Sequence, residues 1–93
     1  MKLTDDTLLK AIAPLDGWAL APDKNSIQKA FTFPTFNAAF GFMSRVALAA
    51  EAMDHHPEWS NIYNKVDVRL TTHSEAGITE KDIKLALIMN GFF

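Results

Sequence analysis

The three histidines of this 93-residue chain all lie in one stretch, "DHHPEWSNIYNKVDVRLTTH", which spans residues 54–73. They are His55, His56 and His73. Imidazole is the side chain that ordinarily changes charge between about pH 5 and pH 8, so it can both donate and accept a proton at cellular pH. Three imidazoles brought close together would therefore suit acid–base catalysis.

The pattern around the histidines predicts a β-hairpin that gathers them. Apolar and polar residues alternate over residues 66–72, which indicates a half-buried strand. A preceding strand is expected over residues 59–63, with a tight turn in which Asn64 takes the positive φ. The two adjacent histidines precede the first strand and His73 ends the second. Because a hairpin brings its two ends together, we expect the three imidazoles to lie near one another.

Two other interpretations of the histidines remain open at this point. They could be unrelated structural residues at the end of a helix and at the rim of the fold. Three imidazoles with Asp54 or Glu58 could instead bind zinc. Adjacent residues in an extended chain point in opposite directions, however, so His55 and His56 are poorly arranged to share one ion.

Other kinds of chemistry have little support in the sequence. The chain has no cysteine, so it has neither a disulfide framework nor a thiolate nucleophile. It also has no GxSxG motif and no glycine-rich phosphate loop. Near the histidines, Trp59 is either a core residue or the wall of a pocket for a flat ligand. Glu51 and Asp54 are either solvated residues of a last helical turn or acceptors that orient an imidazole.

Composition restricts the partners and the location. A net charge of −2 with nine scattered basic residues gives no electrostatic basis for nucleic-acid binding. The first residues lack the apolar run of a signal peptide, and no segment is long and apolar enough to cross a membrane. We therefore expect a cytoplasmic protein with no membrane association.

The elements that must position the histidines follow from periodicity and capping residues. Helices are expected after Thr4, over residues 36–53 after Thr35, and from Thr79 to a stop at Gly91. Strands are expected over residues 18–21 and 26–33, besides the hairpin. The predicted order is α-β-β-α-β-β-α. Strands joined by short turns pair antiparallel, so we predict an α+β fold in which helices cover one face of a four-stranded antiparallel sheet. A chain of this length is expected to form one domain over residues 1–93.

The helix over residues 36–53 has a wider apolar surface than one sheet face can easily cover. Two apolar stripes lie about 100° apart on it and together span about half its circumference. Either the helix is central and its own chain wraps around it, or one stripe contacts the same helix of another subunit. We expect the second arrangement, with Phe42, Val46 and Ala49 as candidates for the outward stripe. This predicts a homo-oligomer, a dimer or a tetramer. In the last helix, Ile83, Ala86 and Leu87 are expected to form the buried face.

The blocks "DHHPEW", "YNKV", "TTH" and "GITEKDIKLA" resemble, in order and spacing, the pterin-4a-carbinolamine dehydratases. Animal members of this family are also known as the dimerisation cofactor of a hepatocyte nuclear factor. The resemblance extends over essentially the whole chain and is strongest over residues 31–86. It implies a lyase that removes water from 4a-hydroxytetrahydropterin in tetrahydrobiopterin recycling, without a metal or an organic cofactor, in a homotetramer built from stacked long helices.

The resemblance also implies which residues act. His55, His56 and His73 match the active-site histidines of the family. We expect His55 and His73 to transfer protons and His56 to bind substrate or stabilise charge. Glu51, Asp54, Trp59 and Thr72 are weaker candidates for binding the pterin, and the sequence does not decide which histidine is acid and which is base. The alternative function is a non-catalytic binding or transcription-coactivator module on the same scaffold.

Overall fold

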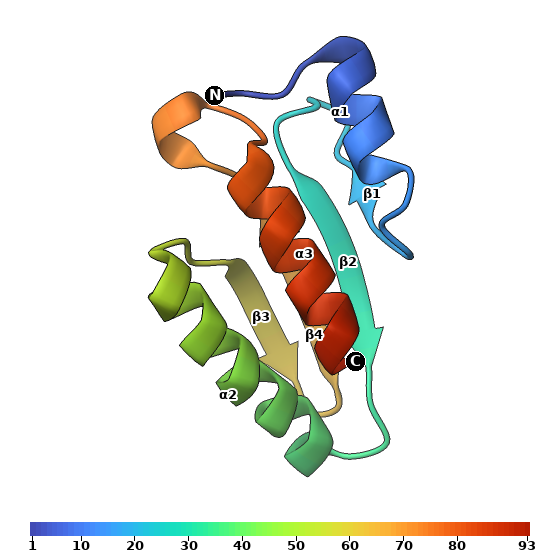
Figure 1. Cartoon of the computed structure of the whole chain (residues 1–93). Coiled ribbons are helices and arrows are strands. Elements are labelled where there is room, and N and C mark those ends of the chain that lie inside the picture. The colour runs from blue at the N-terminus through green and yellow to red at the C-terminus, as the bar shows by residue number, and fades with distance from the viewer.

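The computed structural model describes residues 1–93, which form an α+β fold with one four-stranded antiparallel sheet. The strands are β1 (Ala19–Leu20), β2 (Ile27–Thr32), β3 (Glu58–Ile62) and β4 (Lys65–Leu70), and their order in the sheet is β1-β2-β4-β3. The helices are α1 (Asp5–Ile12), α2 (Phe36–Met53) and α3 (Glu80–Phe92), with a short 3-10 turn, η1 (His73–Glu75). Figure 1 shows α2 and α3 side by side across one face of the sheet, with α1 beside β1. The predicted fold class and element order are confirmed.

The core lies between the sheet and the two long helices. Alternation in the two central strands turns Ile27 and Phe31 of β2, and the apolar residues of β4, toward α2 and α3. The opposite face of the sheet carries polar and small side chains. No helix is long and apolar enough to cross a membrane.

The β3–β4 hairpin is tight, but its turn differs from the one expected. Ile62 pairs with Lys65, so Tyr63 and Asn64 alone form the loop. Tyr63 rather than Asn64 has the positive φ, at 50°. The side-chain amide of Asn64 (Nδ2) instead donates a hydrogen bond to the Phe33 carbonyl at 2.8 Å, which connects the hairpin to the end of β2. The prediction for Asn64 was wrong because a tertiary hydrogen bond determines its conformation.

Helix α2 begins and ends as its sequence suggests. The Thr35 hydroxyl accepts a hydrogen bond from the Ala38 amide at 3.0 Å, which confirms the predicted cap. At the other end Asp54 has a left-handed conformation with φ 52°, and its amide donates to the carbonyls of Ala50 and Glu51. This residue stops the helix and redirects the chain at His55.

The prediction of which α2 stripe faces outward was wrong. Phe42 and Val46 are fully buried in the core of their own subunit, and Ala49 is only partly exposed. The exposed large apolar residues of α2 are instead Phe36, Phe40 and Leu48. The sequence of α2 contains two apolar stripes, and only the packing of the helix against the sheet and α3 determines which stripe is buried.

Helix α3 also departs from prediction at two points. The Thr79 cap is confirmed, but Gly91 does not stop the helix, which continues to Phe92. Leu87 is exposed, whereas Leu85 and Met89 join Ile83 and Ala86 on the buried face. The hydrophobic periodicity of this helix is weak, because apolar residues occur on most of its circumference.

Candidate active site

The predicted site residues come from the end of α2, the start of β3 and the segment after β4, which meet at one end of the sheet. The first turn of α3 adds Asp82 to them. His55 follows the left-handed Asp54, and its amide donates to the Ala50 carbonyl at 3.0 Å. His73 lies just beyond β4 in η1 rather than within the strand. Each histidine contacts a different carboxylate.

The His55 imidazole is buried against a fully buried carboxylate. Its Nε2 lies 2.6 Å from Asp82 Oδ1, and His55 is 8% exposed whereas Asp82 is 0% exposed. An ionised carboxylate only accepts hydrogen bonds, so Nε2 carries the proton of this contact. Nδ1 is therefore the nitrogen through which a neutral His55 can accept a proton.

Asp82 is held in place by two further donors. Its Oδ2 accepts hydrogen bonds from the Thr72 hydroxyl at 2.7 Å and from the Thr79 amide at 2.9 Å. The Thr72 and Thr79 hydroxyl oxygens are 2.8 Å apart, and because Thr72 already donates to Asp82, Thr79 must donate to Thr72. The same Asp82 carboxylate is thus the reciprocal cap of α3 and the anchor of His55.

The other two histidines lie in solvent-exposed pairs. His56 Nε2 is 2.8 Å from Glu51 Oε1, across the last turn of α2. His73 Nε2 is 2.8 Å from Glu58 Oε2, and Glu58 Oε1 accepts a hydrogen bond from Arg69 Nη1, also at 2.8 Å. Exposed pairs of this kind add little to stability. Each of these two imidazoles therefore has one carboxylate beside it and is otherwise open to solvent.

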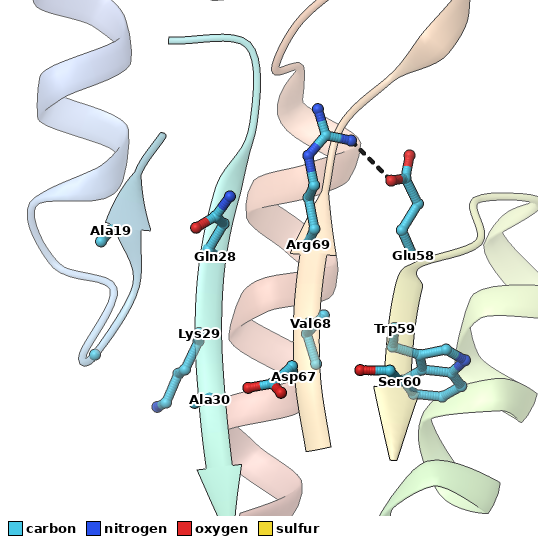
Figure 2. A pocket seen from close by; sticks show the side chains of 11 residues that line it. Ala19, Gln28, Lys29, Ala30, Glu58, Trp59, Ser60, Asp67, Val68 and Arg69 are labelled. Carbon is cyan, nitrogen blue, oxygen red and sulfur yellow. Dashed lines mark hydrogen bonds and ion pairs between the residues drawn. The ribbon is translucent and has the colours of Figure 1, made fainter. Parts of the chain in front are cut away.

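A hollow lies beside the Glu58–Arg69 ion pair, and no histidine lines it. It has a volume of about 580 Å³ and lies on the sheet face that the helices leave uncovered. Figure 2 shows the Glu58–Arg69 ion pair at one end of it, with Asp67 and Ser60 further along the strands. No group of three or more His, Asp or Glu side chains in the structure could hold a metal ion.

The comparison with known families identifies the scaffold. Residues 1–92 match the family model described as "Pterin 4 alpha carbinolamine dehydratase". The chain belongs to this family of dehydratases. The resemblance seen in the sequence blocks around the histidines is confirmed.

Individual relatives match this chain over nearly its whole length. A protein of Mesorhizobium japonicum is 54% identical over 92 residues, which cover 99% of this chain and 94% of the relative. A protein of Paraburkholderia xenovorans is 51% identical over 89 residues, covering 96% of this chain and 93% of the relative. Both carry the name pterin-4-alpha-carbinolamine dehydratase provisionally. The crystal structure of a "transcriptional coactivator/pterin dehydratase" from Brucella melitensis matches with a TM-score of 0.96 at 50% identity, covering 99% of this chain and 98% of that one.

The structure gives each residue predicted to bind the pterin a specific environment. Glu51 contacts His56, whereas Asp54 ends α2 without a side-chain contact to a histidine. Trp59 is partly buried, packs against the core and also lines the hollow. The Thr72 hydroxyl donates a hydrogen bond to the Asp82 carboxylate that anchors His55, so its partner is a protein side chain.

Two histidine partners were missed. Asp82 was not predicted in the site, and Glu58 was predicted only as a possible zinc ligand. The spacing from Thr79 to Asp82 is that of a capping box, which turns the acid back toward the helix start. That signal could have placed Asp82 beside the end of β4, but only the fold brings His55 to it.

Proposed function

We propose that this protein removes water from 4a-hydroxytetrahydropterin and releases quinonoid dihydropterin. In this reaction the C4a–O bond breaks, N5 loses its proton and the C4a–N5 double bond forms. Hydroxide is a poor leaving group, so an imidazolium protonates the departing oxygen, which leaves as water. A neutral imidazole accepts the N5 proton, and the two proton transfers balance over the reaction.

The observation that carries this proposal is the buried contact between His55 Nε2 and Asp82 Oδ1, at 2.6 Å. A carboxylate fixed in this way orients the ring, and it favours the imidazolium that forms when Nδ1 accepts a proton. Asp82 keeps this position because Thr72 and the Thr79 amide hold its other oxygen. His55 is therefore suited to proton transfer at one fixed point.

We assign the second proton transfer to His73 and a binding role to His56. His73 pairs with Glu58, and His56 pairs with Glu51 at the end of α2. In this proposal Asp54 and Trp59 contact the pterin, while Glu51 and Thr72 act through the groups that they hydrogen-bond. No step uses a metal or an organic cofactor. Either proton-transferring histidine can be the acid in this scheme.

The chemistry of the substrate indicates the reactions on either side. A 4a-hydroxypterin arises when a tetrahydropterin-dependent hydroxylase transfers one oxygen atom, and the quinonoid product must be reduced before reuse. We therefore propose a role in tetrahydrobiopterin recycling in the cytoplasm, next to aromatic amino-acid hydroxylases.

The direct test is dehydration of freshly generated 4a-hydroxytetrahydropterin, followed spectroscopically above the uncatalysed rate. We expect catalysis by the wild-type protein and none above background by a variant that lacks both His55 and His73. Equal rates with and without the wild-type protein would refute the proposal.

A second function is favoured by one specific comparison. The Brucella melitensis neighbour is described as a transcriptional coactivator as well as a pterin dehydratase. A protein-binding role of this chain would require exposed apolar surface, which α2 offers at Phe36 and Phe40. Unchanged partner binding by the variant without His55 and His73 would separate this role from catalysis.

A further inference from the structure

The Glu58 carboxylate contacts two side chains at the open end of the β3–β4 hairpin, one through each oxygen. Its Oε2 lies 2.8 Å from Nε2 of His73, and its Oε1 lies 2.8 Å from Nη1 of Arg69. Both oxygens are thus in use, each on a different side chain. One carboxylate links a candidate proton-transferring histidine to a permanent positive charge.

Strand register brings the two members of the ion pair together. Glu58 is the first residue of β3 and pairs directly with Arg69 of β4, so both side chains point to the same face of the sheet. Beyond Arg69 the strand ends at Leu70, and the chain turns into η1 at His73. The imidazole therefore reaches Glu58 from the exit of the same hairpin.

His73 depends on this contact more than His55 depends on its own. The His73 side chain is 80% exposed, and Glu58 is its only side-chain partner. A side chain so exposed otherwise moves among several rotamers, because packing does not select one. Burial restrains His55, whereas an exposed ion pair alone restrains His73.

We propose that Glu58 is a positioning residue for His73 and that Arg69 holds Glu58 in the required orientation. This inference rests on the proposed function. The Glu58 carboxylate, 2.8 Å from Nε2 of His73, favours the neutral tautomer with its proton on Nε2, which leaves Nδ1 to exchange a proton with the substrate. Arg69 occupies one carboxylate oxygen, so the other stays directed at the ring.

The main test compares Glu58→Ala with Glu75→Ala. Glu75 is an exposed acid two residues after His73 and makes no side-chain hydrogen bond, so its removal controls for the loss of one negative charge. We expect Glu58→Ala to lower kcat about tenfold with KM little changed, because His73 loses its only side-chain partner. Glu75→Ala should leave both constants unchanged.

A double-variant cycle isolates the route of the effect. If Glu58 acts through His73, Glu58→Ala should lower kcat no further once His73→Ala is present. Arg69→Met should lower kcat in the same direction but less, about threefold, because it loosens Glu58 without removing it. A further loss from Glu58→Ala in the His73→Ala background would overturn the proposal, as would an Arg69→Met effect larger than that of Glu58→Ala.

A measurement without substrate separates this inference from the proposed function. Ring nitrogen chemical shifts of the neutral His73 should show the proton on Nε2 in the wild-type protein and a mixture of both tautomers in Glu58→Ala. Unchanged tautomer populations would overturn the positioning role even if kcat falls. If the wild-type protein lacks dehydratase activity, the proposed function fails, whereas the tautomer measurement still decides whether Glu58 orients His73.

Discussion

Replacement of Thr72 by valine tests the hydrogen-bond network beneath His55. Valine keeps the shape of threonine and removes only the hydroxyl, which donates to Asp82 Oδ2 at 2.7 Å and is 2.8 Å from the Thr79 hydroxyl. Asp82 is fully buried, so water cannot replace the lost donor. The Asp82 carboxylate then keeps only His55 and the Thr79 amide as partners.

The magnitude follows from the loss of one hydrogen bond to a buried carboxylate. A hydrogen bond to a charged group contributes about 1.5–3 kcal/mol. In a domain of this size each kcal/mol lowers Tm by about 4–8 °C, so Thr72→Val should lower Tm by about 6–24 °C. Because Asp82 also orients His55, we expect kcat to fall about tenfold in parallel, the factor that corresponds to about 1.4 kcal/mol.

Thermal unfolding followed by circular dichroism and the dehydration assay measure the two effects. Thr71→Val is the matched control, because Thr71 donates to the Asn25 carbonyl at 2.6 Å, outside the Asp82 network. It should lower Tm but leave kcat within about twofold. Thr72→Ser keeps the hydroxyl and should retain most of the activity. Equal kcat values for Thr72→Val and Thr71→Val would show that the network does not position His55.

The remaining predictions concern catalysis, metal and assembly. His55→Ala and His73→Ala should each slow turnover by about 10²- to 10⁴-fold; if both keep near-wild-type rates, the histidines are structural. Activity should survive exhaustive chelation, and loss on chelation with recovery by zinc would contradict this. Light scattering should show a dimer or a tetramer that Phe40→Glu shifts toward a smaller species, because Phe40 is 55% exposed on α2. Val46→Glu should unfold the subunit instead, since Val46 is fully buried. A monomeric wild-type protein at micromolar concentration would refute the assembly prediction.

The sequence was most informative where one local pattern determined one element. The alternation in β4 and the Thr35 and Thr79 caps give correct elements because backbone geometry and capping chemistry act over a few residues. The helix and strand order then leaves few topologies for the sheet. These local signals were sufficient to predict the fold class.

The errors arose where two local choices were equally good. The stripes of α2 differ little in apolar character, so only the packing of the helix against the sheet and α3 shows that Phe42 and Val46 are buried. The site was also predicted incompletely, because the partners of the histidines are determined by tertiary contacts. The histidines stand out by type, but their partners Asp82 and Glu58 are ordinary acids whose role depends on contacts made by the folded chain.

The double use of Asp82, as reciprocal cap of α3 and anchor of His55, connects local unfolding to activity. Opening the first turn of α3 breaks the hydrogen bond from the Thr79 amide to Asp82 and frees the carboxylate from His55 in the same event. Hydrogen exchange at the Thr79 amide therefore reports how often His55 loses its anchor. Any change that frays the start of α3 should reduce the fraction of molecules competent for proton transfer, even when the bulk of the domain stays folded.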